Sequence, residues 1–268
     1  MKIGVIGTGN LATSVITGSI RSEKFCGEDF CLYDLFPEKV RELHQKFGTA
    51  SAASAVEVAE SCDVVILAVK PKDFPQLLQS VGAALQQKDP LVLSVAAGLT
   101  KEYICSFLPY APKLARLMTN INASVCGAMT AYCPNDRVTD EERAFLETFC
   151  ASFGDAIELE ESFFPQFGVL AGCVPAFVYK FVDELARAGV QMGFRKDVAL
   201  RIAANTVCGG AKVAAESDVH PYTLIDRVCT PGGTTIDGIM TLDALGFDNA
   251  VHKAVWASYE KDQKLTKH

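Results

Sequence analysis

Residues 229–235 read Cys-Thr-Pro-Gly-Gly-Thr-Thr and separate two stretches with helical patterning. Gly232 and Gly233 carry no side chains, so a small molecule can approach the backbone closely. A helix that follows would begin with backbone N–H groups that lack intrahelical partners and carry partial positive charge. Thr235 adds a hydroxyl beside them. This combination predicts a site for a small carboxylate ligand.

The same stretch also reads as an ordinary turn before a helix. Pro-Gly-Gly is turn sequence, and Thr234 is a favoured N-cap residue. Asp237 follows three positions later, as in a capping box. We therefore expect Thr234 to cap a helix over 234–245, with the turn and the ligand site coinciding.

A second glycine motif lies near the N-terminus. Residues 7–12, Gly-Thr-Gly-Asn-Leu-Ala, fit G-x-G-x-x-A directly after the first apolar strand. Gly7 permits a tight turn, Gly9 lets a pyrophosphate approach the backbone, and Ala12 allows close helix–strand packing. At the first strand–helix turn this pattern predicts dinucleotide binding rather than a turn alone. The loop residues expected at the cofactor are Gly7, Thr8, Gly9, Asn10 and Leu11.

Asp34 ends the second predicted strand, where a carboxylate would bond the adenosine ribose hydroxyls. It would repel a 2′-phosphate, and no Arg follows immediately, so the sequence favours NADH over NADPH. Equally, Asp34 reads as a polar strand end before the helix that Pro37 opens. Both interpretations stay open.

Two further loops follow predicted strands and should line the same crevice, since ligands lie beyond the carboxyl ends of strands in open α/β sheets. The predicted contacts are Ala68, Val69, Lys70, Pro71 and Ala97. Lys70 is also consistent with a solvated lysine, and Pro71 with a simple stop to its strand.

The elements that position these residues divide the chain in two. Over 1–161, apolar strands alternate with amphipathic helices, which predicts an α/β domain of the Rossmann type with a doubly wound, mainly parallel sheet. Thr139 and Glu142 predict a capping box at the start of the last of these helices. Strands are expected at 2–7, 30–34, 63–69, 91–97, 113–118, 124–132 and 156–160. Helices are expected at 37–47, 54–61, 74–87, 100–108 and 139–154.

Over 162–268 the strand signals stop, which predicts an all-helical domain. Its helices are apolar over much of their circumference, as buried or interface helices are. We expect this domain to pack against a second copy of the chain, although a thick intramolecular core would also explain the composition. Helices are expected at 167–193, 196–217, 234–245 and 249–265.

Composition excludes several classes of function. The net charge is −7 with no basic stripe, which disfavours nucleic-acid binding. The ten cysteines form no CxxC pair and the four histidines are not spaced with them like a zinc site, so no metal is expected. No uninterrupted apolar run would span a bilayer, and the N-terminus moves straight into a strand. These features predict a soluble, cytoplasmic protein without a membrane partner.

Taken together, the motifs resemble the pyrroline-5-carboxylate reductase family. The resemblance rests mainly on 220–243, HPYTLIDRVCTPGGTTIDGIMTLD, and spans nearly the whole chain, with GTGNLA, VILAVKP, SVAAGLT and TVCGGAKV in order. It implies a dinucleotide-binding domain followed by a helical dimerisation domain, and a homodimer or higher oligomer with a site shared between subunits. The implied reaction is hydride transfer from NAD(P)H to the C=N bond of 1-pyrroline-5-carboxylate, giving L-proline.

The resemblance also implies roles for individual residues. Thr235 would be the catalytic residue, its hydroxyl reaching the ring nitrogen, while backbone amides of 232–235 hold the substrate carboxylate. Asn120, retained in a loop bordering the nicotinamide, would contact the cofactor. The implied substrate-binding residues are Asp218, Thr230, Gly232, Gly233, Thr234 and Thr235.

Three stretches depart from the family pattern. MTNIN at 118–122 lacks two prolines, AGCVPAF at 171–177 has Val174 in place of a glycine, and SAASAVE at 51–57 lacks an Asn. Val174 and the altered 118–122 loop motivate one alternative, a reductase of a related cyclic imine acid. A separate alternative is a catalytically silent paralogue that binds dinucleotide and regulates a partner. The intact Thr235 and glycine pair favour an enzyme.

Overall fold

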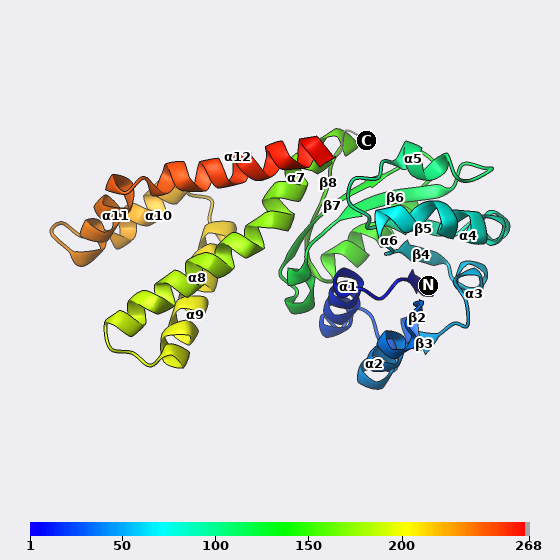
Figure 1. Cartoon of the computed structure of the whole chain (residues 1–268), viewed down its shortest axis with the longest axis horizontal. Helices are drawn as coiled ribbons and strands as arrows, with labels where there is room; N and C mark the ends of the chain where they lie inside the picture. Colours follow the sequence, from blue (N-terminus) through cyan, green and yellow to red (C-terminus); the bar gives the residue numbers. More distant parts are fainter. Residues whose placement is uncertain (266–268) are drawn as a thin grey trace. The chain divides into compact units, whose positions relative to one another are not determined.

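The computed structural model describes residues 1–265 of the chain. It forms two compact units, Met1–Gly172 and Cys173–Leu265, whose elements are labelled in Figure 1.

The first unit is built on an eight-stranded sheet with the order β3-β2-β1-β4-β5-β6-β7-β8. All neighbouring strands are parallel except β6 and β7, which are antiparallel. The reversal on the two sides of β1 makes the sheet doubly wound, as the sequence predicts. The strands are β1 Ile3–Ile6, β2 Phe30–Tyr33, β3 Ala50–Ser51, β4 Val64–Leu67, β5 Leu91–Ser94, β6 Lys113–Met118, β7 Ala128–Pro134 and β8 Gly154–Glu158.

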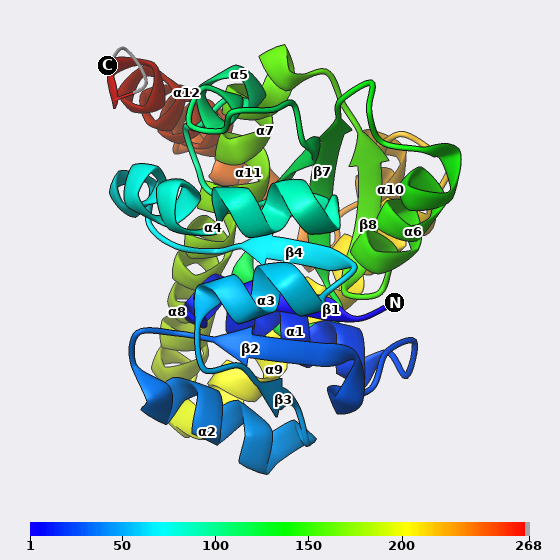
Figure 2. The ribbon, with the colours of Figure 1, turned by 90° about the vertical axis from the view of Figure 1, so that its right-hand side faces the viewer.

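Helices cover both faces of this sheet, because the central strands are apolar on both sides. One core cluster holds residues of α1, α2 and α6 against one face, and a second holds residues of α3, α4 and α5 against the other. Figure 2 shows α3 and α4 running alongside the strands β2 and β4. The helices are α1 Asn10–Arg21, α2 Pro37–Phe47, α3 Ala55–Ser61, α4 Phe74–Lys88, α5 Lys101–Cys105 and α6 Asp140–Ala151.

Every strand and helix predicted for the first unit is present, with ends shifted by a few residues. The capping box is confirmed: Thr139 Oγ1 accepts from Glu142 N at 3.2 Å, and Glu142 Oε2 accepts from Thr139 N at 3.0 Å. The prediction misses β3, whose two residues are too few to show an alternating pattern.

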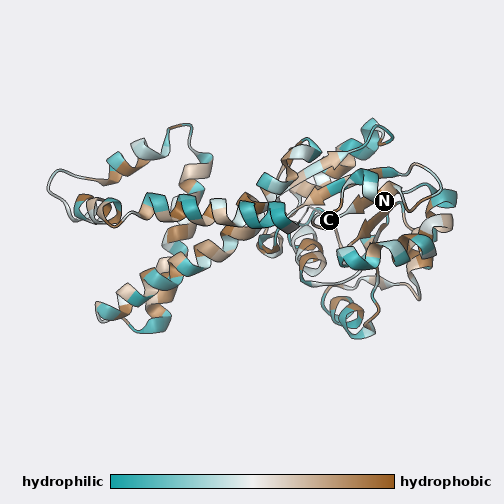
Figure 3. Ribbon diagram, turned by 45° about the horizontal axis from the view of Figure 1, so that its top comes forward, coloured by the Kyte–Doolittle hydropathy of each residue, from teal (hydrophilic) through white to brown (hydrophobic). Residues whose placement is uncertain are grey.

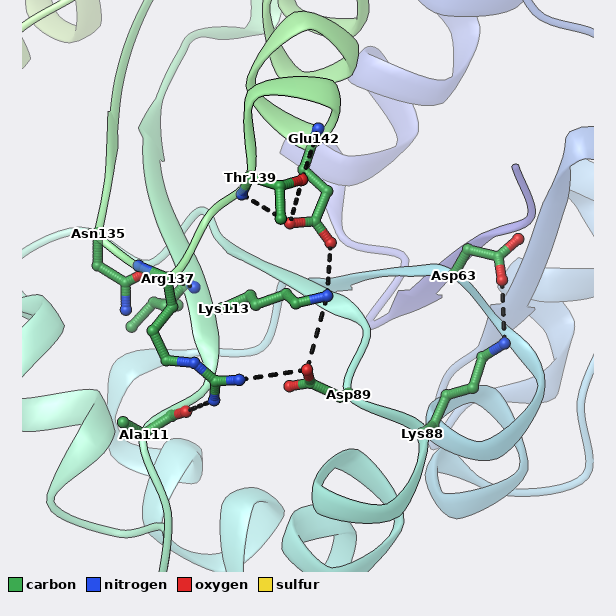
Figure 4. Close-up of polar contacts among 10 residues, drawn as sticks. Asp63, Lys88, Asp89, Ala111, Lys113, Asn135, Arg137, Thr139 and Glu142 are labelled. Atoms are coloured by element: carbon green, nitrogen blue, oxygen red, sulfur yellow. Dashed lines mark hydrogen bonds and ion pairs between the residues drawn. The ribbon is translucent and has the colours of Figure 1, made fainter.

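An ion-pair cluster lies at the amino end of β6 (Figure 4). Lys113 Nζ lies 2.9 Å from Glu142 Oε1 and 3.5 Å from Asp89 Oδ2, and Arg137 also reaches Asp89, at 3.3 Å. Arg137 Nη1 donates to the carbonyl oxygen of Ala111 as well. These contacts link the C-terminal end of α4 and the N-terminal end of α6 to the first residue of β6. They lie at the edge of the sheet opposite the glycine-rich loop.

The second unit is helical, as predicted, but has almost no interior. Its buried core cluster consists of Ala186, Ala199 and Ala203. Large apolar side chains along its helices are exposed instead, including Phe194, Trp256 and Leu245, the last 82% exposed. Hydrophobic segments recur along these helices in Figure 3. The helices are α8 Val174–Gln191, α9 Lys196–Glu216, α10 Pro221–Val228, α11 Thr234–Ala244 and α12 Phe247–Leu265, of which α10 was not predicted.

A continuous helical stretch, Glu161–Gln191, comprises the short helix η4 (Glu161–Phe163), α7 (Phe164–Phe167), the π-helix η5 (Gly168–Cys173) and α8. By length and composition alone it is apolar enough to cross a membrane. This stretch was not predicted as a candidate span, because polar and charged residues interrupt its apolar sequence. The same properties are found in core helices of soluble proteins.

Candidate active site

The glycine-rich loop after β1 packs backbone to backbone against the loop after β4. Gly7 has a φ of 98° and its N–H donates to Tyr33 O at 2.8 Å. A Cβ at Gly7 would lie 2.7 Å from the carbonyl oxygen of Ala68, so no larger residue fits. The structure thus brings together two of the predicted cofactor segments, 7–11 and 68–71.

Gly9 is the N-cap residue of α1 and gives the helix no side-chain cap. The first turn of α1 contains no acidic residue, and a Cβ at Gly9 would meet no atom within 4 Å. The N–H groups of Asn10 and Leu11 therefore begin a helix beside open space. Unpaired donors and the positive end of the helix dipole suit an anionic group, so these residues fit a dinucleotide phosphate.

Asp34 is bonded to this same loop. Thr8 donates to Asp34 Oδ2 through both its backbone N–H, at 2.6 Å, and its hydroxyl, at 2.9 Å, while Phe36 N donates to Oδ1 at 2.9 Å. Burial acts to raise the pKa of Asp34, but these hydrogen bonds outweigh it and hold the pKa below its usual value. Asp34 thus carries a negative charge at the end of β2 and also fixes the loop that would hold the pyrophosphate.

The remaining predicted cofactor residues of the strand ends differ in exposure. Ala68 and Val69 are half-buried, while Lys70, Pro71 and Ala97 are exposed. Pro71 opens the short helix η2, Pro71–Asp73, which accounts for it structurally. All five follow β4 or β5 at the carboxyl edge of the sheet, the edge at which the glycine-rich loop also lies.

Asn120 is 8% exposed, and both ends of its carboxamide are used within the protein. Oδ1 accepts from Asn122 N at 2.9 Å, and Nδ2 donates to the carbonyl oxygen of Ala171 at 2.8 Å. Asn120 therefore fixes the loop after β6 to the π-helix η5. This holding role was not part of the prediction for Asn120.

The turn at 229–233 departs from the predicted capping arrangement. Gly233, not Thr234, is the N-cap residue of α11, and no side chain caps this helix, so the predicted Thr234–Asp237 capping box is wrong. The reason is the turn itself: Gly233 N–H donates to Thr230 O at 2.9 Å, and Gly232 has a φ of 66°. Thr234 is consequently already the first helical residue.

The loop nevertheless offers the donors that the sequence predicts. A Cβ at Gly233 would lie 2.3 Å from Thr230 Oγ1 and 3.1 Å from Thr230 O, so glycine allows the close turn without displacing the Thr230 side chain. Thr234 and Thr235 are exposed at the uncapped start of α11, where backbone N–H groups face outward. Asp218 is exposed in a different loop, between α9 and α10.

Metal-type clusters are not found: within residues 1–265, no three His, Cys, Asp or Glu side chains lie together as ligands would. All ten cysteines are free thiols.

Comparison with protein families matches both parts of the chain. Residues 161–265 match the family described as pyrroline-5-carboxylate reductase dimerisation. Residues 2–98 match the family described as NADP oxidoreductase, coenzyme F420-dependent.

Individual relatives match over the full length. The chain is 38% identical over 267 residues to a pyrroline-5-carboxylate reductase of Escherichia coli, covering 99% of this chain and 98% of that protein. The structure of a pyrroline-5-carboxylate reductase from Coxiella burnetii superposes with a TM-score of 0.90 at 27% identity, covering 100% and 99%. The Plasmodium falciparum pyrroline carboxylate reductase with NADP bound has a TM-score of 0.86 at 24% identity, covering 100% and 98%. The chain belongs to the pyrroline-5-carboxylate reductase family.

Proposed function

We propose that this protein is a pyrroline-5-carboxylate reductase that uses NAD(P)H to reduce the C=N bond of 1-pyrroline-5-carboxylate, giving L-proline. One observation carries the proposal beyond family membership. Two helices, α1 and α11, begin with a glycine N-cap and no side-chain cap, one in each unit. Each presents unpaired N–H donors, which suits one anionic cofactor and one anionic substrate.

The dinucleotide half is formed by the carboxyl edge of the sheet. The N–H groups of Asn10 and Leu11 bind the pyrophosphate, and the loops at 68–71 and 96–98 line the crevice. Asp34 bonds the ribose hydroxyls, since Oδ1 has acceptor capacity beyond Phe36 N. Because its charge would repel a 2′-phosphate, we propose that NADH is preferred.

The substrate half is the start of α11. Backbone N–H groups at 232–235 bind the substrate carboxylate, with Thr230 and Asp218 at its border. The Thr235 hydroxyl forms a hydrogen bond with the ring nitrogen. It can donate or accept, so it serves both the neutral imine and the protonated form.

When bound, the reduced nicotinamide supplies the hydride. The residues of the chain hold the two reactants in the orientation that hydride transfer needs and exclude other orientations. This is the main requirement when the acceptor is a cationic imine. Fixing the carboxylate on amide donors sets the position of the ring, and Thr235 fixes its nitrogen. Neither step requires a metal ion or a histidine base.

We further propose that the protein is a cytoplasmic homodimer and that each site combines a dinucleotide domain, 1–161, with the helical domain, 162–268, of the other subunit. The matched dimerisation family and the exposed apolar helices support the dimer. A second copy also gives the apolar stretch Glu161–Gln191 a protein partner rather than a membrane.

The test is oxidation of NADH and NADPH by the purified protein with 1-pyrroline-5-carboxylate, comparing Thr235→Ala with Thr241→Ala. Both threonines are exposed on α11, but Thr241, as far as residues 1–265 show, uses its hydroxyl within the helix, donating to Asp237 O at 2.8 Å. We expect Thr235→Ala to lower kcat by roughly 10² and Thr241→Ala to leave it unchanged. Folded wild-type protein without turnover would refute the proposed function.

Val174 favours a second candidate, a reductase of a related cyclic imine acid. It opens α8 beside η5 and replaces the glycine of the family pattern with a branched side chain. A Val174→Gly variant should then change the ratio of kcat/KM for 1-pyrroline-5-carboxylate to that for a cyclic imine acid with a larger ring or an added substituent.

A further inference from the structure

A single carboxylate oxygen joins three elements of the first unit. Glu161 Oε1 accepts from Arg116 Nη1 at 2.8 Å and from the backbone N–H of Lys101, also at 2.8 Å. Arg116 lies in the middle of β6, Lys101 is the first residue of α5, and Glu161 opens the helical stretch that leads into the second unit.

The Arg116 partners come from one short segment. Arg116 is only 5% exposed, and its guanidinium lies over the ring of Phe164 at 4.7 Å from the ring centroid. Both groups that stabilise this buried cation, the Glu161 carboxylate as counter-ion and the Phe164 ring by a cation–π contact, therefore belong to residues 161–164. Because an unpaired buried charge is strongly unfavourable, this segment cannot shift away from β6.

Lys101 connects the same carboxylate to the loop after β5. Thr100 Oγ1 accepts from Tyr103 N at 3.0 Å and fixes the start of α5. The Glu161 bond to Lys101 N then anchors that start, and with it the loop containing Ala97, which we propose lines the cofactor crevice.

The other end of the segment is anchored to the loop after β6. Asn120 Nδ2 donates to Ala171 O at 2.8 Å, and a Cβ at Gly168 would lie 2.8 Å from Met118 Sδ. The segment 161–171 therefore contacts both loops. Its first residue binds Lys101 at the end of the loop after β5, and its last residue binds Asn120 in the loop after β6.

We infer that Glu161 is a positioning residue for hydride transfer: through Lys101 and Arg116 it holds the two loops that border the nicotinamide end of the crevice in register. This inference rests on the proposed function for its kinetic readout. The binding readout is independent of the proposed function, because the affinity for the dinucleotide can be measured without any substrate.

The experiment compares three variants with a matched control. Glu161→Gln keeps an oxygen that can accept from Lys101 N but removes the charge. Arg116→Met/Glu161→Leu removes the buried cation together with its partner, which preserves folding, and leaves Lys101 N without an acceptor. Glu161→Ala leaves Arg116 unpaired. The control is Glu160→Ala, which removes an exposed neighbouring carboxylate with no hydrogen bond or ion pair among the described residues.

Melting temperature, kcat and the Kd for NADH and NADPH by fluorescence titration are the readouts. We expect the double variant to melt near wild type yet show a kcat lowered roughly tenfold and a raised Kd, since small misplacements are costly in catalysis. Glu161→Gln should be intermediate, and Glu160→Ala should match wild type.

Wild-type kcat and Kd in both the folded double variant and Glu161→Gln would overturn the inference, leaving Glu161 a purely structural residue. If wild-type protein binds dinucleotide but does not reduce 1-pyrroline-5-carboxylate, the proposed function fails. The Kd comparison among the variants then still decides the role of Glu161.

Discussion

Thr8 and Asp34 are joined by two hydrogen bonds that end on one oxygen, Asp34 Oδ2, at 2.6 Å from Thr8 N and 2.9 Å from Thr8 Oγ1. The carboxylate that would select the cofactor therefore also shapes the loop that would bind its phosphates. Substitutions at Asp34 and at Thr8 can therefore distinguish the effect of the Asp34 charge on cofactor choice from the support that Asp34 gives to the glycine-rich loop.

An Asp34→Ser variant should raise the ratio of kcat/KM with NADPH to that with NADH by about tenfold, because it removes the charge facing a 2′-phosphate. Thr8→Val is the control: it removes one of the bonds to Asp34 but keeps the carboxylate. It should weaken both cofactors alike. An unchanged ratio in Asp34→Ser would exclude Asp34 as the selector.

Gly233→Ala should raise the KM for 1-pyrroline-5-carboxylate by roughly tenfold or more. The new Cβ would lie 2.3 Å from Thr230 Oγ1 and 3.1 Å from Thr230 O, so the Thr230 side chain must rotate and the turn that presents the α11 donors is disturbed. Gly238→Ala, on the same helix with no atom within 4 Å of the added Cβ, serves as comparison. An equal rise in KM in the two variants would instead indicate that any disturbance of α11 weakens substrate binding.

Glu142 should make stability depend on pH in the acid range. Burial acts to raise its pKa, but bonds from Thr139 and Lys113 lower the pKa overall (Figure 4). A lowered folded-state pKa means that the stabilisation is complete above the unfolded value, about 4.3, and is lost as pH falls through the folded value.

Glu142→Gln removes the charge while keeping a capping-box residue. The difference in melting temperature between wild type and this variant should be largest at pH 7 and shrink toward zero below about pH 4. Thr139→Ala, which removes the cap, should cost about 1 kcal/mol at neutral pH. If the difference in melting temperature between wild type and Glu142→Gln did not change with pH, the Glu142 charge would not be the source of the stabilisation.

The melting temperature should rise with protein concentration, because in the proposed homodimer the exposed apolar helices of the second unit would be buried only on association. Its own core is limited to Ala186, Ala199 and Ala203. Linkage then makes stability depend on subunit concentration. Light scattering at the same concentrations should report a dimer, and a monomer with a fixed melting temperature would rule out the shared-site arrangement.

The sheet could be predicted because its central strands are buried on both faces and therefore appear as unbroken apolar runs, as in 64–67 and 91–93. Helix α10 was missed, since its eight residues, Pro221–Val228, lie inside a motif read for its turn. The N-cap at Gly233 was misassigned because propensity favours Thr, whereas the turn closed by Thr230 decided the position.

The site was partly predictable for the same kind of reason. Glycine-rich loops have local signatures, so both helix starts were found. The Glu161–Arg116 bond joins residues 45 apart, and no local pattern pairs them. One signal existed: an arginine within the strand 113–118 needs a partner when that strand is buried.

The small buried core of residues 173–265, centred on three alanines, has a consequence during synthesis. A nascent chain that has left the ribosome but not yet met a second copy displays rows of exposed apolar residues such as Phe194, Val198 and Ile202. Such surfaces promote aggregation, so the interval between translation and assembly is the vulnerable stage in the life of this enzyme. Slow expression at low temperature should limit the aggregation of unassembled chains. Synthesis of several copies close together should shorten the time before a chain meets its partner.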